Sequence, residues 1–192
     1  MNFKDSEYND LSFSKLNCSQ ENLGRKTFSD CIFEKCDFTE SNFNDTRFSE
    51  CEFRDCNLSL VKMDGCKIQD VSFKDCKISG INFTKCNLLI LEFSFENCLI
   101  NCSNFGGLEI PKTSFKGNEI TESDFVNADL TGSDFSNSNL KDTLFHGTNL
   151  TKANFKDAKN YSIDPLNNKI KKAKFSLPEA MSLLKHLEII LE

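Results

Sequence analysis

The sequence has 192 residues and a mass of 21.8 kDa, which is enough for one domain or two very small ones. Its 23 Lys and Arg against 29 Asp and Glu give a net charge of −6, which disfavours binding to DNA or RNA through a basic field. It contains no apolar stretch of the roughly 18 residues that a membrane span needs, and its first residues lack the layout of a signal peptide, so we expect a cytoplasmic protein without membrane contact.

The first 22 residues follow only part of the pattern that dominates the rest of the chain. Phe3, Tyr8 and Phe13 are five residues apart, but Cys18 interrupts the series. We therefore expect residues 1–22 to form either a partial first coil or a cap, with Cys18 exposed.

Residues 23–160 place a large apolar side chain at every fifth position. One series runs from Phe28 to Phe93 and a second, shifted by two residues, from Ile100 to Phe155; together they hold 26 positions without a polar residue and 15 of the 19 Phe. The position two residues earlier is mostly small. A period of five fits neither an α-helix nor a simple strand. Inward residues of alternating size, with polar residues between them, instead indicate a square coil of short extended sides joined by turns.

Several segments resemble the pentapeptide-repeat motif, in which a small residue, Asp or Asn, and Leu or Phe precede two variable residues. Examples are residues 36–40 (Cys-Asp-Phe-Thr-Glu), 128–132 (Ala-Asp-Leu-Thr-Gly) and 153–157 (Ala-Asn-Phe-Lys-Asp). The resemblance implies an all-β fold, a right-handed quadrilateral parallel β-helix with four repeats per coil. Residues 20 apart then stack, and from Ile68 onward Phe falls on two opposite sides of the coil.

The step of seven residues between Phe93 and Ile100 indicates a two-residue bulge near residues 94–99. We expect no side to be lost, because Phe keeps its alternation on both sides of the step. Leu89, Ile90 and Phe95 are then expected to project outward as an apolar patch, which is either a packing irregularity or a contact surface for a partner.

The ten cysteines suggest zinc or disulfides, but they contain no Cys-x-x-Cys pair, and His146 and His186 are the only histidines. Parallel Cβ directions on neighbouring sides also oppose disulfides. We expect buried, reduced thiols, with Cys102 exposed and with three of the thiols stacked 20 residues apart, Cys36, Cys56 and Cys76. Since the sequence has neither a phosphate loop nor a catalytic triad pattern, we expect no metal, no cofactor and no enzymatic activity.

Residues 161–192 are expected to form a linker, a capping helix and a dimerisation tail. Lys169 to Lys174 is predicted to be a solvated part of the linker. Ser176 to Glu179 has the sequence of a capping box, and it would open an α-helix over 177–187 that covers the last coil with one apolar face: Leu177, Ala180, Met181, Leu184 and Leu187. The apolar tail beyond it predicts a homodimer through the C-terminus, with the contact residues Met181, Leu184, Leu187, Ile189, Ile190 and Leu191.

Residues 1–160 hold 25 of the acids against 18 bases. With four sides per coil, Asp30, Glu50 and Asp70 should line one edge. This acidic edge is the candidate partner-binding surface, and a solvated face is the alternative. The candidate residues are Asp30, Glu50, Glu52, Asp55, Asp70, Asp75, Glu92, Glu119, Glu122, Asp124, Asp129 and Asp134.

The chain is similar in length and repeat coverage to Qnr-type quinolone-resistance proteins, and its ending from Tyr161 resembles the microcin-immunity branch of the family. These relatives are dimeric rods that act on DNA gyrase and are proposed to imitate duplex DNA. The resemblance implies a non-enzymatic protein that binds DNA gyrase or topoisomerase IV and protects it from quinolones or peptide toxins, without binding nucleic acid itself. The chain lacks the sizeable projecting loops of Qnr. The alternative function is a scaffold that binds an unrelated protein through the apolar patch.

Overall fold

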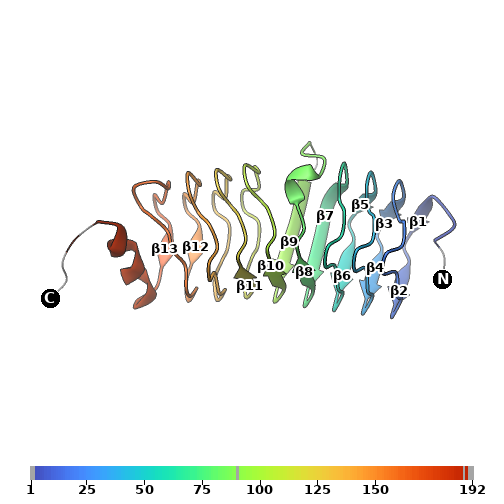
Figure 1. Cartoon of the computed structure of the whole chain (residues 1–192), viewed down its shortest axis with the longest axis horizontal. Helices are drawn as coiled ribbons and strands as arrows, with labels where there is room; N and C mark the ends of the chain where they lie inside the picture. The colour runs from blue at the N-terminus through green and yellow to red at the C-terminus, as the bar shows by residue number, and fades with distance from the viewer. Residues whose placement is uncertain (1–2, 90, 188, 190–192) are drawn as a thin grey trace.

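The structure is a computed structural model that describes residues 3–89, 91–187 and 189. The chain winds into a rod, a parallel β-solenoid of about eight turns, with the N- and C-terminal segments at opposite ends (Figure 1). Throughout these ranges, no helix has both the length and the apolarity needed to cross a membrane.

Each turn of the rod has four sides, which we number in chain order, and equivalent residues of successive turns are paired in parallel, mostly 20 apart. Side 1 consists of β1 (Glu7–Asn9), β3 (Thr27–Ser29), β5 (Arg47–Ser49) and the start of β7 (Lys67–Lys74). Side 2 consists of β2 (Ser12–Ser14), β4 (Ile32–Glu34), β6 (Glu52–Arg54), the end of β7, β9 (Leu91–Glu96), β12 (Asn154–Phe155) and β13 (Lys174–Phe175).

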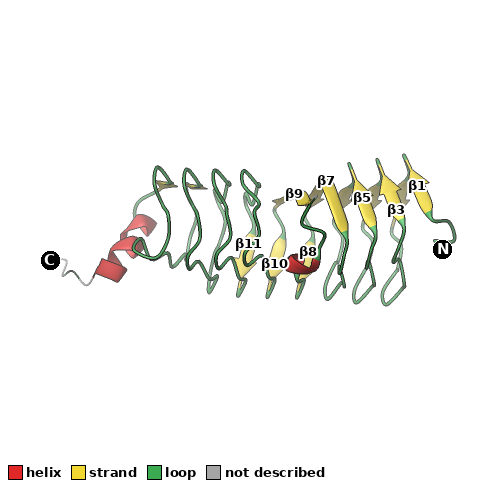
Figure 2. Cartoon of the chain, turned by 90° about the horizontal axis from the view of Figure 1, so that it is seen from above, coloured by secondary structure: helices red, strands yellow, loops and turns green. Residues whose placement is uncertain are grey.

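Side 3 contains β8 (Lys77–Ser79), β10 (Leu99–Asn101) and β11 (Glu119–Thr121). Side 4 is joined by single bridges, such as those from Asn104 to Asn82 and Asp124, and by the short 3-10 helix η1 (Phe83–Lys85). Figure 2 shows the strands concentrated in the N-terminal half, whereas most turns of the C-terminal half are drawn as loops.

The period of five arises from a repeated corner. The residue two places after nearly every inward side chain has a positive φ, as in Asp30 (53°) and Asp55 (52°), which turns the chain onto the next side. The residue before the inward position is often Asp or Asn, and its side chain accepts a hydrogen bond from the backbone two residues later. In Asp129, Oδ1 accepts from the N–H of Thr131 at 2.8 Å. The motif thus encodes a turn, for which Asp and Asn are suited.

The inward side chains form four columns along the rod. The side 2 column is an uninterrupted stack of aromatic rings with centroids 4.7–5.4 Å apart, formed by Phe13, Phe33, Phe53, Phe73, Phe95, Phe115, Phe135, Phe155 and Phe175. On the opposite side 4, Phe83, Phe105, Phe125 and Phe145 stack in the same way. The predicted alternation of Phe between opposite sides is therefore confirmed, except that Phe95 and not Phe93 continues the side 2 column, because Phe93 lies beside Val71.

The small inward position supplies hydrogen-bond donors as well as space. Cys51 Sγ donates to the carbonyl of Phe28 at 3.4 Å, and Thr148 Oγ1 donates to that of Phe125 at 2.9 Å. In both pairs the acceptor lies 23 residues earlier, in the preceding turn. The thiol or hydroxyl thereby finds an acceptor in the interior, where an unpaired polar group is costly, and it links successive turns; the carbonyl of Phe125 accepts from the N–H of Ala128 as well.

The solenoid is longer at both ends than the sequence indicates. At the N-terminus, β1 and β2 pair with β3 and β4, and Cys18 occupies an inward position with 2% exposure, so the prediction that Cys18 is exposed is wrong. At the C-terminus the segment expected to be a linker forms another turn, since Lys169 pairs with Asn149 and Phe175 stacks on Phe155 at 5.1 Å.

The two-residue insertion lies earlier in the chain than the predicted bulge. β9 pairs with β7 so that Phe95 lies beside Phe73, and Phe95 and Ile100 keep the ordinary step of five, so the bulge lies before Phe95 and not at residues 94–99. The inserted loop follows Asn87 and projects from the rod near β9 (Figure 1). The expectation that Phe95 points outward is wrong, because Phe95 is fully buried, whereas Leu88 is 60% exposed.

The C-terminal helix is the 3-10 helix η2 (Glu179–Leu187) rather than an α-helix, and it follows the last turn of the rod (Figure 2). The capping box is also wrong in detail: Ser176 Oγ accepts from the N–H of Asp157 and Glu179 Oε1 from that of Asn160, so both side chains cap the exposed backbone of the preceding turn. Leu183 packs against the core, whereas Leu177 of the predicted apolar face is 77% exposed.

Candidate partner-binding surface

The corner between sides 1 and 2, hereafter the 1–2 edge, carries the strongest charge pattern of the rod. Asp30, Glu50 and Asp70 share this edge, as the spacing of 20 predicts, and each is an exposed residue with positive φ. Asp10 extends the row by one turn, and its N–H donates to the carbonyl of Ser29 at 3.0 Å. Asp10 was not predicted to belong to the row, because Cys18 interrupts the apolar series that would identify the first turn.

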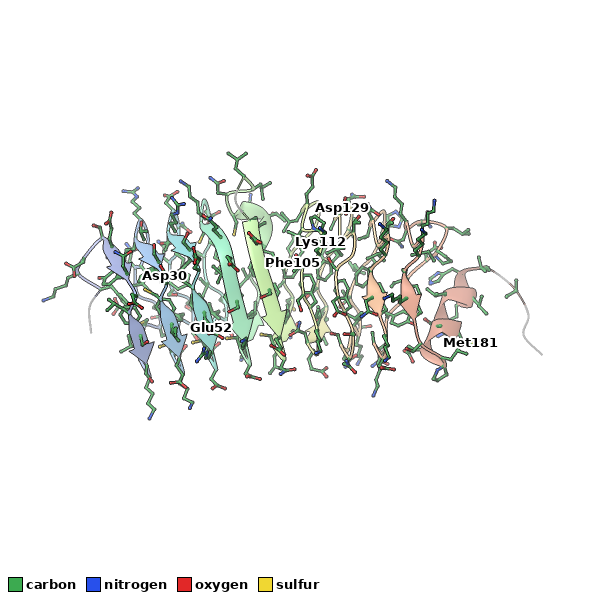
Figure 3. All side chains as sticks on the ribbon, turned by 180° about the vertical axis from the view of Figure 1, so that it is seen from behind. Asp30, Glu52, Phe105, Lys112, Asp129 and Met181 are labelled. Atoms are coloured by element: carbon green, nitrogen blue, oxygen red, sulfur yellow. The ribbon has the colours of Figure 1, made fainter. Side chains whose placement is uncertain are left out.

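The same edge becomes basic beyond the inserted loop. Its positive-φ positions there are Lys112, Gly132, Lys152 and Lys172. In Figure 3, Asp30 and Lys112 lie on opposite sides of the projecting loop along the rod. The acidic edge is therefore confined to the N-terminal half.

Of the remaining candidates of the N-terminal half, only Glu92 lies at this edge, since its neighbours Leu91 and Phe93 pair with Ile68 and Val71. Asp55 and Asp75 occupy the next corner, between sides 2 and 3. Glu52 lies on side 2 between Arg54 and Lys74, with Lys74 Nζ at 3.1 Å, and the hydrogen bond from Arg54 is the main cause that holds the pKa of its carboxyl below the usual value. Glu92 joins Asp70 at a hollow beside the inserted loop.

The acids between Glu119 and Asp134 are divided among all four sides, so their assignment to one acidic edge is wrong. Glu119 pairs on side 3 and Glu122 stands at the following corner; Asp124 pairs on side 4, Asp129 on side 1 and Asp134 on side 2. Residues five apart lie on successive sides, so closeness in sequence disperses them. Burial opposes the ionisation of Asp129, but hydrogen bonds from Thr131 and Asn149 outweigh it, and its pKa is lowered.

The apolar patch is reduced to the inserted loop. Leu89 is 92% exposed and lies at the rim of a hollow of about 640 Å³ on side 1, which Asp70, Glu92, Phe93 and Lys112 also line. Ile90, predicted to belong to the patch, lies outside the described residues.

The predicted dimerisation residues remain partly accessible at the C-terminal end of the rod. Met181, Leu184 and Ile189 line a shared hollow, and Leu187 is 39% exposed. Ile190 and Leu191 lie outside the described residues. The hollow leaves apolar side chains available for contact at this end.

Nine of the ten cysteines are buried free thiols, and these include Cys18, which was expected to be exposed; the tenth, Cys102, is exposed as predicted. Cys36, Cys56 and Cys76 stack as expected, with Sγ atoms that donate to Phe13, Phe33 and Phe53 of the preceding turns. Burial raises the pKa of Cys86 to about 12. Buried neutral thiols of this kind are unreactive.

The two histidines, His146 and His186, line one hollow together with Asp142, Ser162 and Asp164. This proximity was not foreseen, because His186 belongs to η2 and His146 to the rod. No group of three or more His, Cys, Asp or Glu suited to a metal ion occurs among the residues that the structure describes.

The geometry defines a repeat solenoid whose interior is structural and whose outer charges distinguish its faces. Two family profiles match the chain: "Pentapeptide repeat region" over residues 26–105, and "Pentapeptide repeats (8 copies)" over residues 98–137 and 123–159. The chain belongs to the pentapeptide-repeat proteins. No curated protein matches it in sequence.

Solved structures of pentapeptide-repeat proteins share the fold at low sequence identity. A structure of trypsin-treated QnrB1, a plasmid-mediated fluoroquinolone resistance protein, has a TM-score of 0.63 and 16% identity, and the match covers 97% of this chain and 100% of QnrB1. HetL, involved in heterocyst differentiation regulation in the cyanobacterium Nostoc sp. strain PCC 7120, has a TM-score of 0.60 and 12% identity, with 90% and 86% covered. At such identities the likeness establishes the fold.

Proposed function

We propose that the protein is a non-enzymatic partner of a type II topoisomerase, DNA gyrase or topoisomerase IV, and protects it from quinolones or peptide toxins by imitating DNA. The observation that carries this proposal is the row of Asp10, Asp30, Glu50 and Asp70 at the same corner of four successive turns. The likeness in fold to QnrB1, a fluoroquinolone resistance protein, supports it.

The row offers a topoisomerase a regular line of negative charge, as a DNA strand does. Successive turns of a parallel β-solenoid are about 4.8 Å apart, whereas successive phosphates of one strand advance about 3.4 Å along the helix axis. The row is therefore sparser than the phosphates of a DNA strand, and what it shares with one strand is a regular line of negative charge. Because the edge carries lysines beyond the inserted loop, the topoisomerase would contact the N-terminal half of the rod.

Dimerisation through the C-terminus belongs to the same proposal. Met181, Leu187 and Ile189 expose apolar surface at the end of the rod. A two-fold contact between these ends would produce a longer rod with an acidic half at each extremity.

The proposal is tested by supercoiling with purified DNA gyrase in the presence of a quinolone. The wild-type protein should restore supercoiling, and the triple variant Asp30→Asn, Glu50→Gln, Asp70→Asn should require at least about tenfold more protein, because each lost carboxylate weakens attraction to a basic surface. The matched control, Glu40→Gln, Asp45→Asn, Asp142→Asn, removes three charges from positive-φ corners of other edges and should act like the wild type.

A protein that neither inhibits gyrase nor rescues it at any stoichiometry would contradict the proposal. The alternative, a scaffold for an unrelated protein, then rests on the exposed Leu89 of the inserted loop. An equal loss in the two triple variants would indicate a dependence on net charge alone and would remove the role of the 1–2 edge.

A further inference from the structure

Side 1 and its edge carry two parallel columns of charge. The first column is the 1–2 edge. The second is formed by the residues that precede the inward position of side 1, and strand register and bridges align them from turn to turn. The charged members of the second column are Glu7, Arg47 and Lys67 before the inserted loop and Glu109, Asp129 and Lys169 after it.

We propose that side 1 binds side 1 of a second copy of this chain, with the two rods antiparallel. A two-fold axis that runs along the strands near the inserted loop places each column opposite its own reversed copy. In that arrangement opposite charges face each other in the turns on either side of the axis; the one like pair is Glu92, which lies beside Asp70 in the strand register and meets its own copy on the axis. The facing pairs are Asp10 with Lys172, Asp30 with Lys152, Asp70 with Lys112, Glu7 with Lys169, Arg47 with Asp129 and Lys67 with Glu109.

These charges lack ionic partners within their own chain. The ion pairs among the described residues involve Arg25, Lys35, Arg54 and Lys74, and none of these belongs to the two columns. All the column charges are exposed except Asp129, which is half-buried. Side 1 therefore presents complementary charges without ion pairs inside the monomer, although Asp129 accepts hydrogen bonds from Thr131 and Asn149 and Arg47 donates one to Gln69.

The centre of the proposed interface combines apolar and charged side chains, and Asp70, Glu92 and Lys112 line part of it. The inserted loop exposes Leu89, and the adjoining hollow is lined by Phe93, Ile110 and Pro111. Because the two-fold axis passes close to the loop, Leu89 of each copy can enter the hollow of the other. This contact removes from water the most exposed large apolar side chain among the described residues.

The interface should be weak and sensitive to salt. Exposed ion pairs contribute little individually, and the pattern supplies orientation and register more than affinity. We expect a dissociation constant on the order of micromolar at low ionic strength.

The pairing goes beyond the proposed function. It covers the acidic row, so a second copy and a topoisomerase would compete for that row, but self-association itself needs no topoisomerase.

Sedimentation velocity of the full chain tests the charge pairing. Asp30→Lys and Lys152→Asp should each weaken self-association at low salt by roughly tenfold, because each reverses two symmetry-related pairs. The double variant should recover the wild-type affinity, since residue 30 of one copy faces residue 152 of the other. Glu40→Lys, at a corner of another edge, is the matched control and should leave self-association unchanged.

Cross-linking tests the direction. In a Cys102→Ser background, an Asp30→Cys copy mixed with a Lys152→Cys or Lys172→Cys copy should be joined by a short bismaleimide, whereas Asp30→Cys copies alone should not. Efficient joining of Asp30→Cys copies to each other would overturn the antiparallel arrangement. Self-association that does not respond to salt or charge reversal, but is lost in the double variant Leu187→Lys, Ile189→Lys, would belong to the C-terminal contact and would overturn the proposal. A protein that is still monomeric at about 100 μM, well above the expected dissociation constant, would also overturn it.

Discussion

The two halves of the rod, before and after the inserted loop, build the same interior from different residues. Before the loop the small inward position is mostly Cys, and Phe occupies all four sides in Phe28, Phe33, Phe38 and Phe43. After the loop the small position is mostly Ser, Thr or Ala, and Phe alternates with Ile and Leu. The side chains of Cys51 and Thr148 nevertheless make equivalent hydrogen bonds: each donates to the backbone carbonyl 23 residues earlier.

This difference shows which requirements the fold imposes. The interior needs a large side chain, a small one that frequently carries a donor, and a corner residue that tolerates positive φ. The chemical identity of the large residue and the charge of the corner are free, as Asp30 and Lys152 at equivalent corners show. The outer charges can therefore serve partners without cost to the core.

The largest effect should come from interrupting an aromatic stack in the C-terminal half. Phe105 lies between Phe83 and Phe125, with both centroid distances 4.7 Å, and is fully buried. Phe105→Ala should lower the free energy of unfolding by about 3–5 kcal/mol, measured by urea denaturation. Phe105→Leu should cost less, because aliphatic residues fill the equivalent place on neighbouring sides.

The control for this stack is Leu144→Ala, which truncates an outward residue of the same side that is 58% exposed. It should change stability by less than about 0.5 kcal/mol. Equal losses for Leu144→Ala and Phe105→Ala would contradict the inward assignment of the column.

The donor at the small position should matter next. Thr148→Val keeps the volume but removes one of the two hydrogen bonds to the carbonyl of Phe125, which still accepts from the N–H of Ala128, and we expect a loss of about 0.5–1.5 kcal/mol. In the N-terminal half, Cys51→Ser keeps a donor and should cost much less than Cys51→Ala. If Val at residue 148 were as stable as Thr, the hydrogen bond to the preceding turn would not explain the choice of residue at this position.

Much of the interior could be predicted because burial acts at every repeat. The period of five identified the inward residues, the thiol stack and the alternation of Phe, all of which depend on local spacing. The place of the inserted loop could not be predicted, since Phe93 and Phe95 both suit an inward position and both are buried. Leu88 fits the period in sequence and is nevertheless exposed.

The surface was less predictable because it depends on the register across the whole rod. The lysines of the 1–2 edge become visible only when Lys112 is aligned with Asp70, 42 residues earlier, and this requires knowledge that two residues are inserted between them. The ends were obscured for a similar reason. Cys18 fills an inward position that Phe or Leu holds elsewhere, and Tyr161 and Ile163 are buried although they leave the period of five.

Alkaline pH should distinguish the thiol half from the hydroxyl half. Burial raises the pKa of both Cys66 and Cys86 above the usual value of 9.0. The pKa of Cys66 lies well above that value, and the pKa of Cys86 is about 12. Below pH 9 both thiols are neutral in either state. Above it they ionise first in the unfolded chain, so stability falls as pH rises toward 12, by up to about 1.4 kcal/mol per pH unit for each thiol. Urea midpoints between pH 8 and 10.5 measure this loss.

The matched variant Cys66→Ser, Cys86→Ser removes these two ionisations, and Thr46 and Thr148 show that hydroxyls are accepted in the same column. The variant should lose less stability than the wild type over the same pH range. Parallel pH profiles for the two proteins would mean that these thiols do not contribute to alkaline unfolding.

The smallest effect concerns the corner that both halves share. Gly107 has φ of 69° and open space where a Cβ would stand, whereas at Gly147 (φ 65°) a Cβ would overlap Oδ1 of Asn127. Gly107→Ala should therefore cost about 1 kcal/mol, the strain of a left-handed residue alone, and Gly147→Ala should cost more. Gly107→Asn should cost less than Gly107→Ala because Asn tolerates this conformation. Thermal unfolding of the three variants ranks them, and a stabilising Gly107→Ala would show that this corner gains more from reduced chain entropy than it loses through strain.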